Sequence, residues 1–393
     1  MILRNFKYSE YDGTPEEWSI NGLDLEKVNL LVGKNATGKS RTLDRIRTLA
    51  NMLTGKQLHP LDLVDATWFN AEFSDASNSY HYFLKTENRE IISEQLAISG
   101  KGESEVVLER KRNGEGEILY SGKKENIKFR LPDNQPAAFL KRDTIQHPFL
   151  EKLFEWADGV IYYSFGIENI QAYFLSPFNF DKIDLLINEG KSKELNNSIA
   201  IFYAGEKEFG ECFKKDILYN MNKIDYCLTN IYLGQNPHSA IEQRADNSII
   251  MLAVTEEDRN AILFQSQMSQ GMFRALFILI KVEFFILKKM PVTILIDDIG
   301  EGLDFDRSTK LIKLLIELAE KNDNIQLIMS TNDRYVMNNV PFKYWQVIER
   351  KGGECKVYNY QNSKEKFDEF KYMGLNNFDF LATDYINSEW KKA

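Results

Sequence analysis

One segment of the chain constrains its fold more than any other, the eight residues Gly33–Ser40. They read GKNATGKS and fill every fixed position of the phosphate-binding pattern G-x-x-x-x-G-K-[ST]. A short apolar run, Val28–Val32, precedes them, and large aliphatic residues recur at three- and four-residue steps over residues 43–53. This arrangement predicts a buried strand, a phosphate loop and an amphipathic helix, in the order that a P-loop protein requires.

The residue types of this segment have physical reasons. Gly33 and Gly38 permit backbone angles that turn successive N–H groups toward phosphate oxygens, and a helix N-terminus adds partial positive charge. Lys39 can reach the β- and γ-phosphates, and the Ser40 hydroxyl can ligate Mg²⁺. A chance match to the pattern would occur in about one such chain in a hundred. We therefore predict ATP and Mg²⁺ as ligands, contacted by Gly33, Asn35, Ala36, Thr37, Gly38, Lys39, Ser40 and Arg41.

A second constraint is the apolar run that ends in two acids, Asp297 and Asp298. A run that is apolar on both faces suits a central parallel strand covered by helices. An acid at the carboxyl end of such a strand would emerge beside the phosphate loop and hold Mg²⁺. We therefore predict Asp297 as a metal ligand together with Ser40. A buried strand with a solvated acidic turn is the structural alternative.

Three further segments stand around the acids in a fixed order. Ser269-Gln270-Gly271 opens a long apolar helix, and Ser269 is a good N-cap, which by itself explains its presence. Ile299–Asp304 follows the acids directly. Ile325–Met329 then reads as another buried strand and is followed by Ser330–Asp333.

This order of motifs resembles the ABC-type ATPase heads of the SMC, RecF and OLD-like group. The loop text and the opening residues Ile2–Phe6 are similar to theirs, and the matches cover residues 1–53 and about 262–340. The resemblance implies an α/β P-loop head with a mixed central sheet and a helical lobe. It also implies that Ser269 and Gly271 form a signature motif, which closes over the γ-phosphate of a nucleotide held by the partner subunit. Ile299–Asp304 would be the D-loop that meets that subunit.

Two positions depart from the family. Where the family usually carries a glutamate base this chain has Asp298, whose shorter side chain withdraws the carboxylate by about 1 Å, enough to cost on the order of a hundredfold in rate. Asn332 stands in place of the switch histidine; it can donate a hydrogen bond to a γ-phosphate but cannot become cationic. With Lys39, Asp298 and Asn332 as the catalytic residues, we expect slow or partner-triggered ATP hydrolysis.

The middle of the chain separates this protein from coiled-coil relatives. We find no sustained heptad repeat between Lys39 and Ser269 and so expect no rod. Residues 66–130 predict an antiparallel meander with strands over residues 67–73, 80–85, 106–112 and 117–120, and the Asn113-Gly114 pair predicts the hairpin turn between the last two. Residues 248–254 predict another strand, ahead of Ser269. The predicted domains are 1–165 (the first half of the nucleotide-binding lobe), 166–245 (a helical lobe) and 246–393 (the second half). We expect a strand pair over residues 344–360 and then an aromatic tail that packs in a core or an interface.

Basic residues of the meander allow two interpretations. They can form a nucleic-acid face or belong to an ordinary solvated hairpin, and we favour the hairpin because the chain carries 49 basic against 58 acidic residues, a net charge of −9. The residues concerned are Arg110, Lys111, Arg112, Lys123, Lys124, Lys128 and Arg130.

Composition and missing patterns exclude several other classes. Three separated cysteines favour a reducing compartment, and charges interrupt the most apolar stretch, Met272–Leu287, so we expect a cytoplasmic protein without a membrane span. Four dispersed histidines and the lack of an HExxH pattern argue against a zinc site, and no G-x-S-x-G elbow is present. Too few residues follow Asp304–Asp306 for a Toprim domain.

These observations predict an ATP-binding head that dimerises around Mg-ATP as a homodimer or higher oligomer and acts as a slow switch. Through the family resemblance, DNA repair or phage defence with a separate effector protein is the expected setting, and nucleic acid is a possible partner. The alternative is a non-hydrolysing, ATP-dependent scaffold that regulates a toxin or nuclease. A small-molecule P-loop kinase, which would not need Ser269, is a third interpretation.

Overall fold

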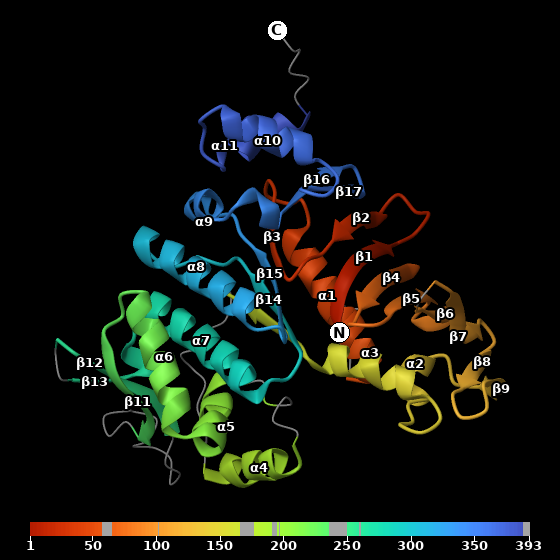
Figure 1. Ribbon diagram of the computed structural model, residues 1–393, viewed down its shortest axis with the longest axis horizontal. Helices are drawn as coiled ribbons and strands as arrows, with labels where there is room; N and C mark the ends of the chain where they lie inside the picture. The colour runs from red at the N-terminus through yellow and green to blue at the C-terminus, as the bar shows by residue number, and fades with distance from the viewer. Residues whose placement is uncertain are drawn as a thin grey trace. The chain divides into compact units, whose positions relative to one another are not determined.

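The computed structural model describes residues 1–56, 65–100, 102–165, 177–190, 195, 197–235, 250–258 and 261–387. The chain divides into two units (Figure 1). The first comprises residues 1–162, 291–298 and 325–393, and the second comprises residues 163–290 and 299–324. The domain boundaries expected from the sequence, after residues 165 and 245, remain predictions.

A parallel group of strands forms the centre of the first unit. β14 (Val292–Asp297), β15 (Ile325–Ser330), β3 (Val28–Val32) and β16 (Trp345–Lys351) are neighbours in this order, and all three pairs are parallel. Every residue of β3, β14 and β15 is buried. Continuous apolar runs therefore became the covered central strands that the sequence predicted.

The sheet continues beyond β16 as a mostly antiparallel series. β17 (Glu354–Asn359), β2 (Trp18–Asp24) and β1 (Ile2–Glu10) follow β16, and the predicted meander follows β1. With β10 (Val160–Ser164) beside β14, the described residues form one sheet of fourteen strands. The meander strands are β4 (Thr67–Ser74), β5 (Ser79–Glu87), β6 (Glu90–Ser99), β7 (Ser104–Lys111), β8 (Glu115–Tyr120) and β9 (Glu125–Arg130).

Two features of the meander bear on the sequence predictions. The predicted hairpin joins β7 to β8, and Gly114 adopts φ +75° there, where a Cβ atom would lie 2.2 Å from the Leu131 carbonyl oxygen. β6 and β9 were not predicted. The mixed sheet with an antiparallel meander is confirmed.

Arg110 corrects the set of basic residues assigned to a surface. Its side chain is fully buried, and its guanidinium donates to the Asp133 carboxylate and the Gln135 carbonyl oxygen, both at 2.8 Å. The fully buried carboxylate of Glu94 lies 3.8 Å away and accepts hydrogen bonds from the backbone N–H groups of Ala137 and Ala138. Arg110 is therefore part of an internal polar network and contributes nothing to a basic face.

Helices pack against the sheet of the first unit, and short helices follow its last strand. α1 (Lys39–Leu53) and α3 (Pro148–Asp158) pack with the strands in one apolar core, and the rings of Phe73 and Trp156 lie 4.5 Å apart. Short elements complete the unit: α2 (Ala137–Leu140), α9 (Arg334–Asn339), η5 (Phe342–Tyr344), α10 (Lys364–Tyr372), α11 (Asp379–Ala382) and η6 (Tyr385–Asn387).

The aromatic tail packs largely as expected. Phe367, Phe370 and Phe380 are almost completely buried and surround Phe342. Tyr372 is 89% exposed and so does not belong to this core. The tail therefore anchors α10 and α11, which Figure 1 shows beyond β16 and β17.

The second unit is mainly helical. It contains α4 (Pro177–Asn188), α5 (Ser198–Phe209), α6 (Glu211–Lys223), α7 (Gln270–Lys288) and α8 (Phe305–Lys321), with η4 (Gln265–Gln267). A small antiparallel sheet is formed by β11 (Leu228–Gln235), β12 (Ile250–Glu256) and β13 (Ile262–Phe264). Residues 248 and 249 of the predicted strand lie outside the described residues. Between Tyr163 and Ser269 the longest described helix is α6, with 13 residues.

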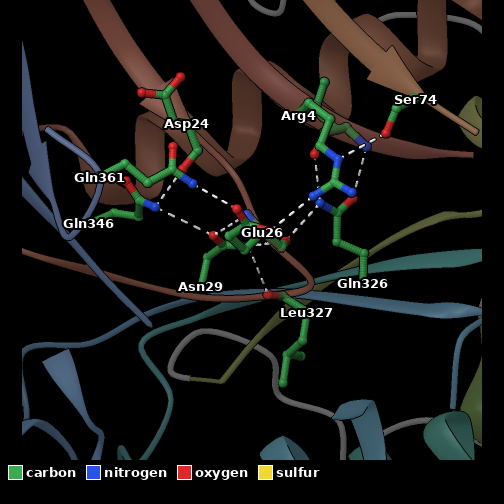
Figure 2. A network of polar contacts seen from close by, with 10 residues as sticks. Arg4, Asp24, Glu26, Asn29, Ser74, Gln326, Leu327, Gln346 and Gln361 are labelled. Carbon is green, nitrogen blue, oxygen red and sulfur yellow. Dashed lines mark hydrogen bonds and ion pairs between the residues drawn. The ribbon is translucent and has the colours of Figure 1, made fainter. Parts of the chain in front are cut away.

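A buried amide at the start of the parallel strands ties them to β1 (Figure 2). Gln326 is 1% exposed; its Oε1 accepts from the Leu3 N–H at 3.1 Å, and its Nε2 donates to the carbonyl oxygens of Leu3 (2.7 Å) and Glu26 (3.1 Å). Arg4 donates to Glu26 at 2.9 Å, on the exposed side of the same network. Because Glu26 lies just before β3, these bonds fix where the phosphate-loop strand begins.

Gln326→Leu should lower the free energy of unfolding by about 2–4 kcal/mol, because it leaves buried backbone groups of Leu3 without partners. Urea unfolding monitored by circular dichroism measures the change. Gln361→Ala is the control, since this exposed side chain donates to Glu26 from the solvent side and should cost less than about 0.5 kcal/mol. If both substitutions have equally small effects, the claim that Gln326 ties the parallel strands to β1 is contradicted.

The second unit contains a carboxyl group in an unfavourable place. Glu283 of α7 is 4% exposed, and Asn220 of α6 donates to its Oε1 at 2.5 Å. Burial, with a smaller contribution from the negative charge of Asp216, raises the pKa of Glu283 to about 7. The folded state therefore keeps the proton between about pH 4.5 and 7, where the unfolded chain has lost it, and stability falls as the pH rises through that window.

Glu283→Gln should remove this dependence, because glutamine mimics the protonated acid. We expect the variant to match the wild type near pH 4.5 and to exceed it by up to about 3 kcal/mol above pH 7. Urea unfolding midpoints at pH 5 and pH 8 test this expectation. A difference between variant and wild type that is the same at both pH values would contradict it.

Candidate functional site

The phosphate loop connects β3 to α1 and is tightly packed. A Cβ atom on Gly33 would lie 2.5 Å from the Ile348 carbonyl oxygen, and one on Gly38, where φ is +98°, would lie 2.5 Å from the Trp18 ring. Ala36 also adopts a positive φ of +62°. Thr37 braces the loop by donating from Oγ1 to the Lys34 carbonyl oxygen at 2.9 Å. The two fixed glycines are thus required by close approach of neighbouring groups as well as by backbone conformation.

The start of α1 is open to an anion. Gly38 is its N-cap, and in this described part of the chain no side chain caps the helix and no acidic residue lies in its first turn. The first N–H groups of a helix have no partner within the helix and carry partial positive charge. Asn35, Ser40 and Arg41 are exposed around this helix end, so a ligand can reach them. The arrangement fits a phosphate group.

Lys39 is buried against the loop that precedes it. Its side chain is 5% exposed, and its Nζ donates to the carbonyl oxygens of Gly33 at 3.0 Å and Lys34 at 3.3 Å. Burial lowers the pKa of Lys39, whereas the charges of Asp298 and Asp297 act in the opposite direction. The ammonium group and the two acids therefore interact electrostatically within one site.

The convergence of these groups follows from the parallel strands. β14, β15 and β3 are adjacent and parallel, so their carboxyl ends lie at one edge of the sheet. Asp297 ends β14, Ser330 ends β15, and Gly33 follows β3. Residues that are almost 300 positions apart in sequence are thereby brought to the same edge.

Asp297 is held by two hydroxyl groups. It is 4% exposed; Ser330 Oγ donates to its Oδ1, and the Tyr162 hydroxyl of β10 donates to its Oδ2 at 3.2 Å. Burial and the charge of Asp297 hold the pKa of Tyr162 well above its ordinary value, so the phenol remains a donor. Sequence reasoning missed both hydroxyl residues. The only local signal was a serine at the end of an otherwise apolar strand.

Asp298 and Asn332 are brought together. Asn332 Nδ2 donates to Asp298 Oδ1 at 3.3 Å, and the Asp298 N–H donates to Ser330 Oγ at 3.0 Å. Asp298 has φ +53°, a left-handed conformation that aspartate and asparagine adopt more readily than other non-glycine residues. The backbone at this position gives a local reason for aspartate in place of glutamate. In this structure the acid is paired with the residue predicted for the switch position.

Arg41 is engaged by the chain itself. Its guanidinium lies 2.5 Å from the fully buried carboxylate of Glu10 and stacks over the Trp18 ring at 4.8 Å. Its role as a nucleotide contact stays a prediction.

The predicted signature residues lie in the second unit. Ser269 caps α7, with its Oγ accepting from the Met272 N–H at 3.2 Å, and it is exposed. Gly271 is buried, and a Cβ atom there would lie 2.8 Å from the Gly302 carbonyl oxygen. Arg274 donates to the Glu301 carbonyl oxygen at 2.7 Å. The start of α7 and the segment expected to be the D-loop therefore pack together, and the Ser269 hydroxyl remains accessible.

A cavity of about 340 Å³ adjoins the phosphate loop within the first unit. The loop, the end of β16 and the carboxyl-terminal elements α11 and η6 line it. Its lining residues include Gly33–Thr37, Ile348, Arg350, Phe380, Asp384 and Ile386. The aromatic tail thus places α11 beside the loop.

Among the residues that the structure describes, no group of three or more His, Cys, Asp and Glu side chains could hold a metal ion. No helix in the described ranges is both long enough and apolar enough to span a bilayer.

Comparison with known proteins shows the fold. No protein-family model matches the sequence, and no curated protein matches it. The crystal structure of an SMC head bound to the C-winged-helix domain of ScpA matches with a TM-score of 0.50 and 12% identity, over 91% of this chain and 98% of that one. An SMC head from Pyrococcus furiosus (13% identity, TM-score 0.45, 94% and 100% of the two chains) and one from Thermotoga maritima (14%, 0.41, 91% and 99%) are also similar.

At these identities the comparison establishes the architecture alone, and it covers most of both chains in the first match. The resemblance expected from the order of motifs is confirmed at the level of the fold. The chain has the fold of SMC head domains, which are ABC-type ATPase heads.

Proposed function

We propose that this protein is an ATP-binding ABC-type head that dimerises around Mg-ATP and hydrolyses it slowly. The observation that carries the proposal is the position of the buried Lys39. It lies against the glycine-containing loop, at the uncapped N-terminus of α1, and interacts electrostatically with the acids at the end of β14. A triphosphate supplies negative charge that the open helix N-terminus and the Lys39 ammonium group attract.

The donor set also fits a divalent cation. Ser40 offers an exposed hydroxyl at the start of α1, and Asp297 offers a carboxylate whose orientation is fixed by two donors. Two protein oxygens are few for a cation, which agrees with a site completed by nucleotide phosphates and water. When bound, Mg²⁺ would neutralise phosphate charge and polarise the γ-phosphoryl group.

A second copy of the chain is proposed to complete the nucleotide site. Ser269 is exposed at the N-terminus of the 19-residue helix α7, next to the segment that resembles a D-loop. Such a helix end can close over the γ-phosphate held by the other copy. ATP would then join two heads, and its hydrolysis would release them.

The pairing of Asp298 with Asn332 supports slow hydrolysis. The hydrogen bond from Asn332 holds one oxygen of Asp298 and so restricts where the carboxylate can orient an attacking water. The same contact favours a second candidate function, an ATP-dependent scaffold that does not hydrolyse. In either case a separate effector protein is proposed, as the SMC head in the first match binds a ScpA domain. A setting in DNA repair or phage defence, with nucleic acid as a further partner, remains part of the proposal.

Equilibrium ATP binding with Mg²⁺ and phosphate release test this function together. We expect Lys39→Ala to lose at least about tenfold in affinity, since it removes a buried charge that faces the phosphates. Asp298→Asn should bind ATP like the wild type and release phosphate about a hundredfold more slowly, because the amide cannot accept a proton. Lys123→Ala, an exposed lysine of the meander, is the control and should change neither quantity.

Each outcome has a distinct meaning. Unchanged binding by Lys39→Ala would overturn the nucleotide site. Unchanged phosphate release by Asp298→Asn would remove Asp298 from the mechanism. Binding without any phosphate release by the wild type would favour the scaffold.

A further inference from the structure

The hydroxyl of Tyr162 is the feature of the site that neither the family resemblance nor the motifs assign. It lies on β10, the strand beside β14, and donates to Asp297 Oδ2 at 3.2 Å. Ser330 Oγ donates to the other oxygen of the same carboxylate. Each oxygen of Asp297 therefore has a donor among the residues that the structure describes, and the carboxylate plane is fixed.

Tyr162 is itself held in place from the phosphate-loop helix. The guanidinium of Arg47, on α1, lies 4.7 Å from the centre of the Tyr162 ring. Arg47 in turn donates to Asp44 at 2.5 Å, one turn earlier on the same helix. A cation over the face of a tyrosine ring is attracted to it, so the helix that carries Ser40 also orients the ring that holds Asp297.

The two hydroxyl donors leave part of the Asp297 carboxylate available to other groups. An ionised carboxylate offers about four lone-pair positions, and the two hydroxyl groups occupy about two of them. The remaining positions can hold a cation, directly or through its water shell, without any rotation of Asp297. Asp298 belongs to the same chain of bonds, because its N–H donates to Ser330 Oγ at 3.0 Å.

We propose that Tyr162 is a positioning residue for the divalent cation, which fixes the Asp297 carboxylate so that it receives a hydrated metal ion. The inference rests on the proposed function and deepens it, because it names what sets the cation affinity of the nucleotide site. Groups that orient a ligand from outside the coordination sphere typically contribute 10- to 100-fold to metal affinity. Loss of the Tyr162 hydroxyl should therefore change the Mg²⁺ concentration that nucleotide binding needs, and leave the contacts between the chain and the phosphates unchanged.

The test is the Mg²⁺ dependence of ATPγS binding by the full chain. Tyr162→Phe removes one oxygen and keeps the ring under Arg47. We expect the Mg²⁺ concentration for half-maximal binding to rise about tenfold, with ATPγS binding in EDTA unchanged. Ser330→Ala removes the other donor and should shift the Mg²⁺ requirement in the same direction.

Tyr80→Phe is the matched control. Tyr80 lies in the same unit, in the meander, and its hydroxyl also donates to an aspartate, Asp75, at 3.0 Å. It should leave the Mg²⁺ requirement at the wild-type value, and thermal unfolding midpoints show that each variant is folded.

The outcomes separate this inference from the function on which it rests. If folded Tyr162→Phe needs no more Mg²⁺ than the wild type, the inference is overturned while nucleotide binding stands. If both tyrosine variants shift alike, the effect is not specific to Asp297 and the inference also fails. If the wild type binds no ATPγS at any Mg²⁺ concentration, the proposed function fails first.

Discussion

The parallel alignment of β14, β15 and β3 is the constraint on which the rest of the structure depends. Only parallel neighbours bring their carboxyl ends to one edge, so the acids at the end of β14, the end of β15 and the phosphate loop meet because of this pairing. The buried amide of Gln326 secures the opposite end by joining β15 to β1 and to Glu26, two residues before β3. A slip of one residue in any of these strands would turn its end groups to the other face of the sheet.

Much of this could be predicted because the signals are local. The phosphate loop requires glycines at fixed positions, the apolar runs require a covered sheet, and Ser269 has the chemistry of a helix cap. The prediction of strands and surface residues failed where a residue's role depends on a contact with a distant part of the chain. β6 contains the buried Glu94, which interrupts the apolar alternation, and its partner Arg110 was counted as a surface charge. Only Phe129 is buried in the edge strand β9, so no alternation marks it.

Tyr162 illustrates a different limit of sequence reasoning. A tyrosine in an apolar strand is ordinarily a core residue, and nothing nearby in sequence indicates that its hydroxyl meets a carboxylate 135 positions away. The two departures from the expected family pattern, in contrast, were visible in the sequence, but the sequence did not show what these side chains contact. The left-handed backbone of Asp298 and its hydrogen bond from Asn332 give these two positions a shared physical setting, in which the acid is paired with the residue predicted for the switch position.

The central claim is that a nucleotide is enclosed by the phosphate loop of one copy and Ser269 of another. Mixing two variants, Lys39→Ala and Ser269→Arg, tests it most directly, with sedimentation velocity in Mg-ATP as the measurement. Each variant alone lacks both composite sites and should stay monomeric, whereas a mixed pair contains one intact site. The account predicts a dimer peak in the mixture only. A mixture as monomeric as either variant, when the wild type dimerises, or a Ser269→Arg protein that dimerises like the wild type, would contradict it.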